Sequence, residues 1–376
     1  MIVVYILLAI VILLFMVLIH EFGHYVAGKI LKFKITEFSV GFGFPIFTRT
    51  SKKTGEKFSL RIFPLGGYCS FEGEDDEGES SSPTAFNNQK PWKRIIVFLA
   101  GVTANFLTAI IFSWILLCTI GYDVPQIARF NQVYTNPYQV GDVITHIEGQ
   151  KIDFAFGGNF VDLVTSEKQT ALAQYREQYE ANGNSLEGVE ASYTFEMTVK
   201  RDGELQNLTI TIYPVVEVNS TNGEEYVNVY TGLESAEGED PCTVAYVYDA
   251  WSGFCRSFEM AFGFAWVVLK SLWMLITFQI PITEMGGTIA TISTIATMAS
   301  QSMSYILVFI PLIAANLAVF NVLPFPALDG SHVLFTIIEW IRGKPINRKV
   351  ESMIHFVGLC ILFGFVIIVD ILHFVL

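Results

Sequence analysis

Four stretches without Asp, Glu, Lys or Arg are long enough to cross a lipid bilayer. They cover residues 1–19, 95–120, 303–328 and 352–369. Because a helix needs roughly 20 apolar residues to span the hydrocarbon core, each stretch predicts a spanning helix. A fifth apolar stretch, residues 258–278, contains Glu259 and Lys270, and these charges favour a helix that lies on the outer membrane surface.

The residues between the second and third spans are polar and numerous enough to form a folded domain. Within them, strand patterns flank a turn at Glu148-Gly149, and a helical pattern covers residues 165–182. We therefore divide the chain into four segments. These are an N-terminal membrane core at 1–120, an α+β domain at 121–235, an interfacial amphipathic region at 236–302 and a C-terminal membrane core at 303–376.

Composition supports a membrane protein that also carries soluble mass. The chain is 52% hydrophobic and only 16% charged. Its net charge of −13 argues against a nucleic acid as partner. The five cysteines form no C-x-x-C pair; Cys118 and Cys360 lie in apolar stretches as expected of core residues, and Cys242 and Cys255 are close enough in sequence to form a disulfide.

The segment His20-Glu21-Phe22-Gly23-His24 follows directly on the first apolar stretch. Positions i and i+4 of a helix share a face, so His20 and His24 can hold one zinc ion. Glu21 beside them can act as general base toward the water that a catalytic zinc activates. The alternative is a pair of histidines satisfied by neighbouring helices, but ionisable side chains in a spanning segment are costly and usually functional.

A catalytic zinc usually has three protein ligands, and Asp329 is the candidate for the third. It closes a long uncharged stretch, just after Pro324 and Pro326 break the helix. The alternative is an aspartate that caps a helix at the interface. His332 is a competing ligand that we interpret as supporting or structural. We assign no metal role to His146, His355 or His373.

The distribution of basic residues predicts the orientation. Lys and Arg are frequent between the first two spans and absent before the first, which places the N-terminus outside and this loop in the cytoplasm. The metal motif then lies toward the cytoplasmic leaflet and the polar domain outside. If Asp329 reaches the same depth, the chain crosses only once between Arg256 and Asp329, and both termini are extracytoplasmic.

The loop after the first span predicts a β-hairpin that dips into the membrane beside the zinc. It combines the Gly-rich segment 38–47, which contains Gly41-Phe42-Gly43, with the alternating segment 57–63. An ordinary interfacial loop is the alternative. An open strand edge could unwind a substrate helix by adding it as a further strand, which would expose its peptide bonds.

These motifs together resemble the site-2 protease family. The resemblance is carried by the HEFGH segment in a first span, the Gly-Phe-Gly hairpin, and Asn321-Val322-Leu323-Pro324-Phe325-Pro326-Ala327-Leu328-Asp329-Gly330 near the C-terminus. The closest type is the bacterial regulator-of-sigma-E protease with one PDZ domain. The resemblance implies that His20, His24 and Asp329 bind Zn²⁺, that Glu21 is catalytic, and that Asn316 and Asn321 hold the substrate backbone or the oxyanion.

The resemblance also implies a fold and a substrate class. The fold is a polytopic α-helical membrane protein with four spanning helices, a membrane-associated β-hairpin and an inserted extracytoplasmic PDZ-like α+β domain. The substrates are single-span membrane proteins already trimmed on the outside, such as anti-sigma factors, or remnant signal peptides, in the bacterial plasma membrane. The sequence departs from the family at Val102, where a proline is usual, and at Ser331, where a second glycine is usual.

Two other classes of function use similar residues. A membrane metal-ion transporter with an extracytoplasmic regulatory domain would also carry ionisable residues at membrane depth. An inactive membrane-anchored PDZ adaptor would keep the outer domain without chemistry. The glutamate next to a ligand histidine and the nearby strand edge favour the protease over both.

Overall fold

The computed structural model describes residues 2–74, 82, 84–152, 160–219, 223–233, 243–279 and 286–375. The chain forms two compact units: residues Met1–Ile115 with Phe254–Leu376, and residues Leu116–Gly253. The proposed disulfide between Cys242 and Cys255 lies outside the described residues, because they do not include Cys242. The boundaries of the four predicted segments stay a prediction.

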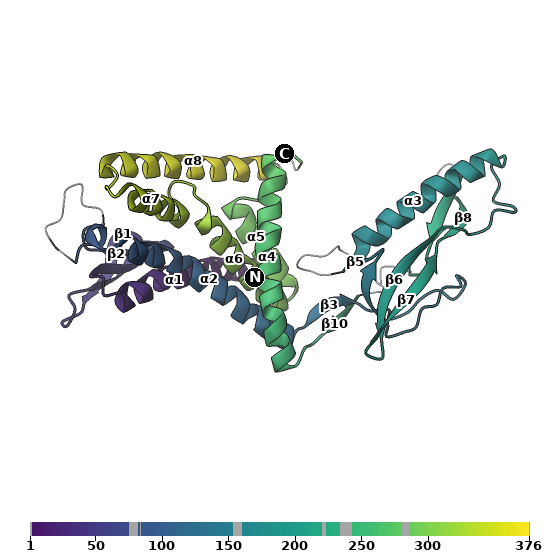
Figure 1. Cartoon of the computed structure of the whole chain (residues 1–376), viewed down its shortest axis with the longest axis horizontal. Coiled ribbons are helices and arrows are strands. Elements are labelled where there is room, and N and C mark those ends of the chain that lie inside the picture. Colours follow the sequence, from purple (N-terminus) through teal and green to yellow (C-terminus); the bar gives the residue numbers. More distant parts are fainter. Residues whose placement is uncertain are drawn as a thin grey trace. The chain divides into compact units, whose positions relative to one another are not determined.

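The first unit is mainly helical (Figure 1). Its helices are α1 (Ile2–Ile30), α2 (Pro91–Thr119, whose last turn belongs to the second unit), α4 (Ala250–Ile276, whose first turn belongs to the second unit), α5 (Thr288–Gln301), α6 (Ser304–Val322), α7 (Asp329–Arg342) and α8 (Arg348–Val375). Five helices of the described residues, α1, α2, α4, α6 and α8, are long and apolar enough to cross a membrane. The chain is thus a multi-pass membrane protein, and the arrangement with four spans and a surface-lying α4 stays a prediction.

Small residues allow the helices around α1 to approach one another closely. Ala9 and Met16 of α1 are buried against Ala109 of α2, Ile295 of α5 and Ala314 of α6. In lipid, such small-residue contacts replace the hydrophobic drive that packs helices in water. One face of α1 therefore packs against α2, α5 and α6, whereas Leu7, Val11 and Phe15 on α1 are exposed.

The segment between α1 and α2 folds into two long antiparallel strands, β1 (Ile35–Thr50) and β2 (Lys57–Phe71), followed by the short 3₁₀ helix η1 (Phe86–Asn88). Residues 37–40 of β1 pair both with residues 57–60 and with residues 67–70 of β2. Both strands therefore bend back, and four short segments lie side by side in the order 47–50, 57–60, 37–40 and 67–70. Gly41 and Gly66 have φ values of +84° and +122°, which residues with a Cβ rarely adopt, and they allow the bends.

The second unit is built from small antiparallel sheets and one long helix. Strands β5 (Gln150–Lys151), β4 (Val143–Ile147), β6 (Thr194–Arg201) and β7 (Glu204–Thr211) form a sheet in that order. Two further pairs are β3 (Tyr122–Pro125) with β10 (Thr243–Tyr246), and β8 (Tyr213–Val218) with β9 (Glu225–Tyr230). Helix α3 (Phe160–Ala181) contacts β4 and β9.

Candidate metal centre

Three side chains from opposite ends of the chain meet at one point. His20 and His24 lie one turn apart on α1, and Asp329 is the first residue of α7. Asp329 Oδ2 is 2.8 Å from His20 Nε2 and 3.3 Å from His24 Nε2, and the two Nε2 atoms are 3.1 Å apart. Both histidines are more than nine-tenths buried. The structure thus brings together the three residues predicted as metal ligands.

Glycines allow the three side chains to meet, because they stand at the two points where the backbone passes closest to its neighbours. Gly101 places α2 directly against the histidines: a Cβ there would lie 2.4 Å from His24 Nε2. Gly330 lets the start of α7 fold back on the end of α6, because a Cβ there would lie 2.1 Å from the carbonyl oxygen of Val322. Pro324 and Pro326 keep residues 323–328 out of the helix between them.

The hydrogen bonds around the site leave acceptor atoms facing one another. His24 Nδ1 is 2.8 Å from the carbonyl oxygen of Val97, so it carries a proton and donates it there. His24 Nε2 is then a lone-pair acceptor, yet it faces the carboxylate oxygen of Asp329. That oxygen is buried and accepts no hydrogen bond within the described residues. Two buried acceptors in contact need a positive charge between them, which either a proton on His24 Nε2 or a bound metal ion supplies.

The distances fit a metal ion of the size of zinc. With ligand bonds of about 2.0–2.2 Å in tetrahedral geometry, neighbouring ligand atoms lie about 3.3 Å apart. The three separations of 2.8, 3.1 and 3.3 Å are close to this value. Two imidazoles and one carboxylate are also a donor set that zinc accepts. The three residues present therefore fit the protein ligands of a catalytic zinc.

Glu21 connects this centre to the sheet. It follows His20 on α1, and its carboxylate accepts a hydrogen bond from the backbone N–H of Cys69. A Cβ at Gly67 would lie 3.4 Å from its Cγ. The segment of the sheet that reaches Glu21 is therefore 67–69, at one edge of the four-segment order, whereas Gly41, Phe42 and Gly43 lie at the bend of β1.

Asn316 and Asn321, the two asparagines predicted to hold substrate, both lie on α6. Asn316 is exposed and Asn321 is half-buried. Neither side-chain amide makes a hydrogen bond to another described residue. Their donors are thus available, and their roles stay a prediction.

Sequence reasoning missed Asn105 as a neighbour of the metal ligands. Its side chain is fully buried on α2, and its Nδ2 lies 3.2 Å from His20 Nδ1. The amide can serve either tautomer of His20, because Nδ2–H can donate to a lone pair and Oδ1 can accept from Nδ1–H. Its position as a buried amide inside the uncharged stretch 95–120 was the available signal.

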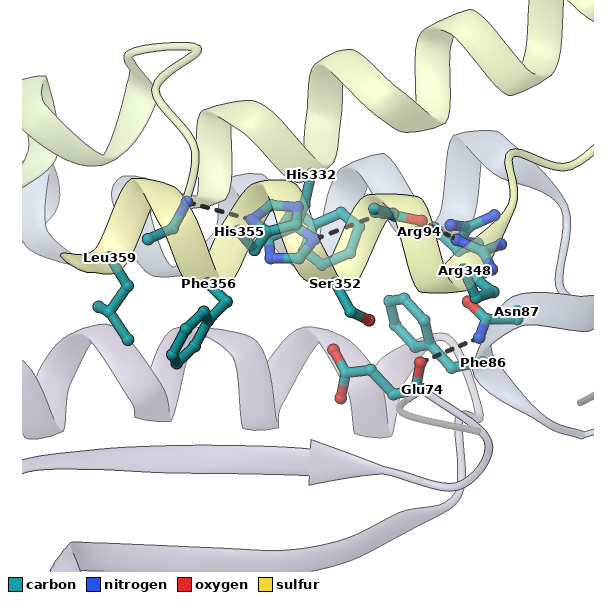
Figure 2. Close-up of a pocket in the computed structure, with 13 residues that line it drawn as sticks. Glu74, Phe86, Asn87, Arg94, His332, Arg348, Ser352, His355, Phe356 and Leu359 are labelled. Atoms are coloured by element: carbon teal, nitrogen blue, oxygen red, sulfur yellow. Dashed lines mark hydrogen bonds and ion pairs between the residues drawn. The ribbon is translucent and has the colours of Figure 1, made fainter. Parts of the chain in front are cut away.

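His332, the competing ligand, belongs to a different cluster with Glu351 and His355. The rings of His332 and His355 stack with centroids 4.0 Å apart (Figure 2). His355 Nδ1 accepts a hydrogen bond from the backbone N–H of Ala327, so the neutral ring carries its proton on Nε2. A histidine that binds metal normally donates its other ring N–H rather than accepting a hydrogen bond. This cluster is thus not arranged as a metal site.

The second cluster lines a cavity of about 410 Å³, beside a buried ion pair. Arg94 of α2 donates to Glu339 of α7 at 2.7 Å, and Arg348 of α8 lies 3.0 Å from the same carboxylate. Burial alone would raise the pKa of Glu339, but the N–H of Ile346 and the two guanidinium groups hold it below its ordinary value. Partial burial between the Phe98 and His355 rings, together with the positive charge that His355 can carry, lowers the pKa of His332 to about 4.

Comparison with known proteins gives a consistent result. Three relatives each bear the name "Putative zinc metalloprotease". The relative from Clostridium perfringens is 27% identical over 98% of this chain and 97% of its own length, and the one from Fusobacterium nucleatum is 25% identical over 97% of both chains. The relative from a Synechocystis strain is 28% identical over 97% of this chain and 94% of its own length. The model of peptidase family M50 matches residues 8–365. The chain therefore belongs to peptidase family M50, the site-2 protease family predicted from its motifs.

Proposed function

We propose that this chain is an intramembrane zinc metalloendopeptidase that hydrolyses peptide bonds within transmembrane segments. The observation that carries the proposal is that Asp329 contacts His20 and His24, and that these two histidines lie on α1, a helix long and apolar enough to span a bilayer. The family match and the names of the relatives support the same chemistry. Peptide hydrolysis would then take place within the depth of the lipid.

The chain's own residues divide the work of hydrolysis. Zinc, when bound by the three ligands, would supply a Lewis acid that polarises the scissile carbonyl and lowers the pKa of water to about 7. Glu21 accepts the proton of the attacking water and returns it to the leaving amine. Asn321 on α6, with Asn316, offers amide donors to the substrate backbone or to the developing oxyanion.

The sheet beside Glu21 offers a means to present the substrate. A transmembrane helix hides its peptide bonds in its own hydrogen bonds, so it must unwind before cleavage. Segment 67–70 is an outer segment of the sheet and reaches Glu21 through the Cys69 amide. A substrate added as a strand near this edge would bring its carbonyl groups beside the catalytic glutamate. Gly41, Phe42 and Gly43 would form the bend that supports this edge.

The orientation of α4 supports the predicted topology. Figure 1 draws α4 across the direction of α1, α2 and α8 within the same unit. If those three helices follow the membrane normal, α4 lies along the surface, and four helices span. Both termini are then extracytoplasmic, and the metal centre lies toward the cytoplasmic leaflet of a bacterial plasma membrane, from which water enters.

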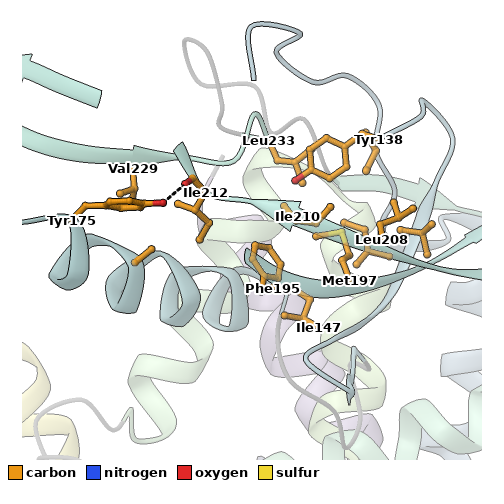
Figure 3. Close-up of a cluster of buried hydrophobic side chains, with 14 of the residues drawn as sticks. Tyr138, Ile147, Tyr175, Phe195, Met197, Leu208, Ile210, Ile212, Val229 and Leu233 are labelled. Carbon is orange, nitrogen blue, oxygen red and sulfur yellow. Dashed lines mark hydrogen bonds between the residues drawn. The ribbon is translucent and has the colours of Figure 1, made fainter. Parts of the chain in front are cut away.

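The second unit is suited to act as a PDZ-like filter outside the membrane. Its core is independent: Phe195, Met197 and Ile210 are fully or almost fully buried (Figure 3). Tyr175 of α3 is fully buried and still donates to the carbonyl of Ile212. One helix packed on small antiparallel sheets is compatible with a PDZ-like domain. It would exclude partners with bulky outer domains and admit single-span proteins that have already been trimmed, such as anti-sigma factors or remnant signal peptides.

The test is cleavage of model transmembrane segments by the purified protein, with zinc content measured on the same samples. We expect cleavage that a chelator abolishes and zinc restores. Glu21→Gln should retain zinc and lose cleavage by roughly 10²- to 10⁴-fold, because the general base is removed. Glu180→Gln, an exposed change on α3, is the matched control. Zinc transport without cleavage would favour a metal-ion transporter. The absence of both activities would favour an inactive adaptor.

A further inference from the structure

We propose that His355 of α8 is a positioning residue that holds the loop before Asp329, so that the Asp329 carboxylate reaches the paired histidines. This inference rests on the proposed zinc site and adds to it a residue from the last helix. The segment concerned is residues 323–328, which connects α6 to α7 and ends at the third metal ligand.

The loop adopts a conformation that needs support. Ala327 has a φ of +84°, which a residue with a Cβ rarely adopts unless its surroundings impose it. Its backbone N–H donates to His355 Nδ1 at 3.1 Å. One residue further on, the N–H of Leu328 donates to the carbonyl of Phe325 and closes the turn. The His355 ring thus holds the residue at which the backbone turns toward Asp329.

Helix α8 touches the loop at a second point, one turn after His355. A Cβ at Gly358 would lie 2.4 Å from the Cβ of Pro326 and 2.6 Å from its carbonyl oxygen. Residues i and i+3 share a helix face, so His355 and Gly358 present one surface to Pro326 and Ala327. The helix supports the loop by close backbone packing and by a directed hydrogen bond together.

The His355 ring is itself fixed in place. It stacks on His332 at a tilt of only 9°, and Ser331 Oγ lies 3.5 Å from its Nδ1. His332 and Ser331 both belong to the first turn of α7, which Asp329 begins. Through these contacts α8 holds both the loop and the first turn of α7, the helix that carries Asp329. A displaced loop would displace Asp329, and metal affinity depends on such outer contacts.

The test compares three substitutions of one side chain in the full-length protein in detergent micelles. The Oδ1 of Asn can stand where Nδ1 stands and accept from Ala327, whereas Leu cannot accept and Gln places its oxygen near the Nε2 position. Zinc affinity is measured by graded competition with a chelator, with zinc as the only added ligand. We expect His355→Leu and His355→Gln to weaken zinc binding roughly 10- to 100-fold, and His355→Asn to remain within a few-fold of the wild type.

The backbone contact gives an independent route that leaves the histidine in place. Gly358→Ala should also weaken zinc binding, because the added methyl displaces Pro326. Gly364→Ala on the same helix is the control, since a Cβ there meets nothing within 4 Å of the described residues. Thermal unfolding of each variant identifies those that fail to fold, and Gly358→Ala then carries the test for His355.

The outcomes separate the inference from the proposed function. A wild-type protein that holds no zinc would overturn the proposed site itself. Zinc affinity in folded His355→Leu and Gly358→Ala that equals the wild type would overturn the positioning role alone. Equal weakening of zinc binding in His355→Leu and His355→Asn would also overturn the positioning role, because the acceptor atom would then be irrelevant. In substrate cleavage, excess zinc should restore the kcat of His355→Leu with KM unchanged.

Discussion

The side-chain amide of Asn105 on α2 lies 3.2 Å from Nδ1 of His20 on α1. When Nε2 of a histidine binds a metal, Nδ1 carries the proton and needs an acceptor. A rotation of the amide by a half turn presents Oδ1 to that proton. Asn105 thus orients the ring of His20 and can accept from its Nδ1–H, as the Val97 carbonyl accepts from Nδ1–H of His24.

We therefore expect Asn105→Leu to weaken zinc binding roughly 10- to 100-fold, because the buried Nδ1–H would lose its acceptor. Asn105→Asp keeps an acceptor of the same size and should bind zinc within about tenfold of the wild type. Chelator competition on purified protein measures both. An Asn105→Leu protein with unchanged affinity would show that the amide does not support His20.

The close approach of α2 at Gly101 leads to a second prediction. Gly101→Ala would place a methyl 2.4 Å from His24 Nε2, the atom that binds the metal, so we expect the purified variant to contain far less than one zinc per chain. Metal content by elemental analysis measures this. The helix itself should persist, because alanine favours helices more than glycine does. Circular dichroism serves as the control, and a fully zinc-loaded Gly101→Ala protein would contradict the geometry.

Much of the site follows from local sequence because its determinants are local. The spacing of His20 and His24 sets their shared face, and the prolines before Asp329 set the end of a helix. The structure then brings these three residues together. Asn105 and His355 could not be placed in the same way, because both lie in apolar stretches whose sequence does not indicate which neighbouring element supplies their partners. Only the packing of α2 and α8 assigns those partners.

The sheet shows a different limit of sequence reasoning. The Gly-rich segment 38–47 and the alternation along residues 57–63 predict a β-hairpin. The structure pairs β1 with β2 and continues both strands beyond their glycines, so that residues 37–40 pair on two sides. Glycine permits the positive φ that bends a strand but does not state which strands will meet afterwards. The register was therefore beyond prediction, although the presence of strands was not.

The buried ion pair between Arg94 and Glu339 joins α2 to α7 and should contribute to stability. Arg94→Met leaves Glu339 buried without its nearest charge, and we expect a loss of about 3–5 kcal/mol in the free energy of unfolding. Arg256→Met is the matched control: Arg256 is half exposed and lies 3.8 Å from Glu259, so its loss should cost about 1 kcal/mol or less. Denaturation in mixed micelles measures both, and equal losses would contradict the distinction.

The low pKa of His332 predicts how stability depends on pH. In the unfolded chain this histidine takes up a proton near its ordinary pKa of 6.5, whereas in the fold it stays neutral down to about 4. Between these two pH values the unfolded state therefore binds more protons than the folded state. The contribution of neutral His332 to stability is present above pH 6.5 and is lost as the pH falls toward 4. Thermal midpoints of chelator-treated protein should accordingly fall between pH 7 and pH 4. His332→Asn cannot titrate, so its midpoints should fall less over the same range, and parallel curves for the two proteins would show that His332 does not contribute.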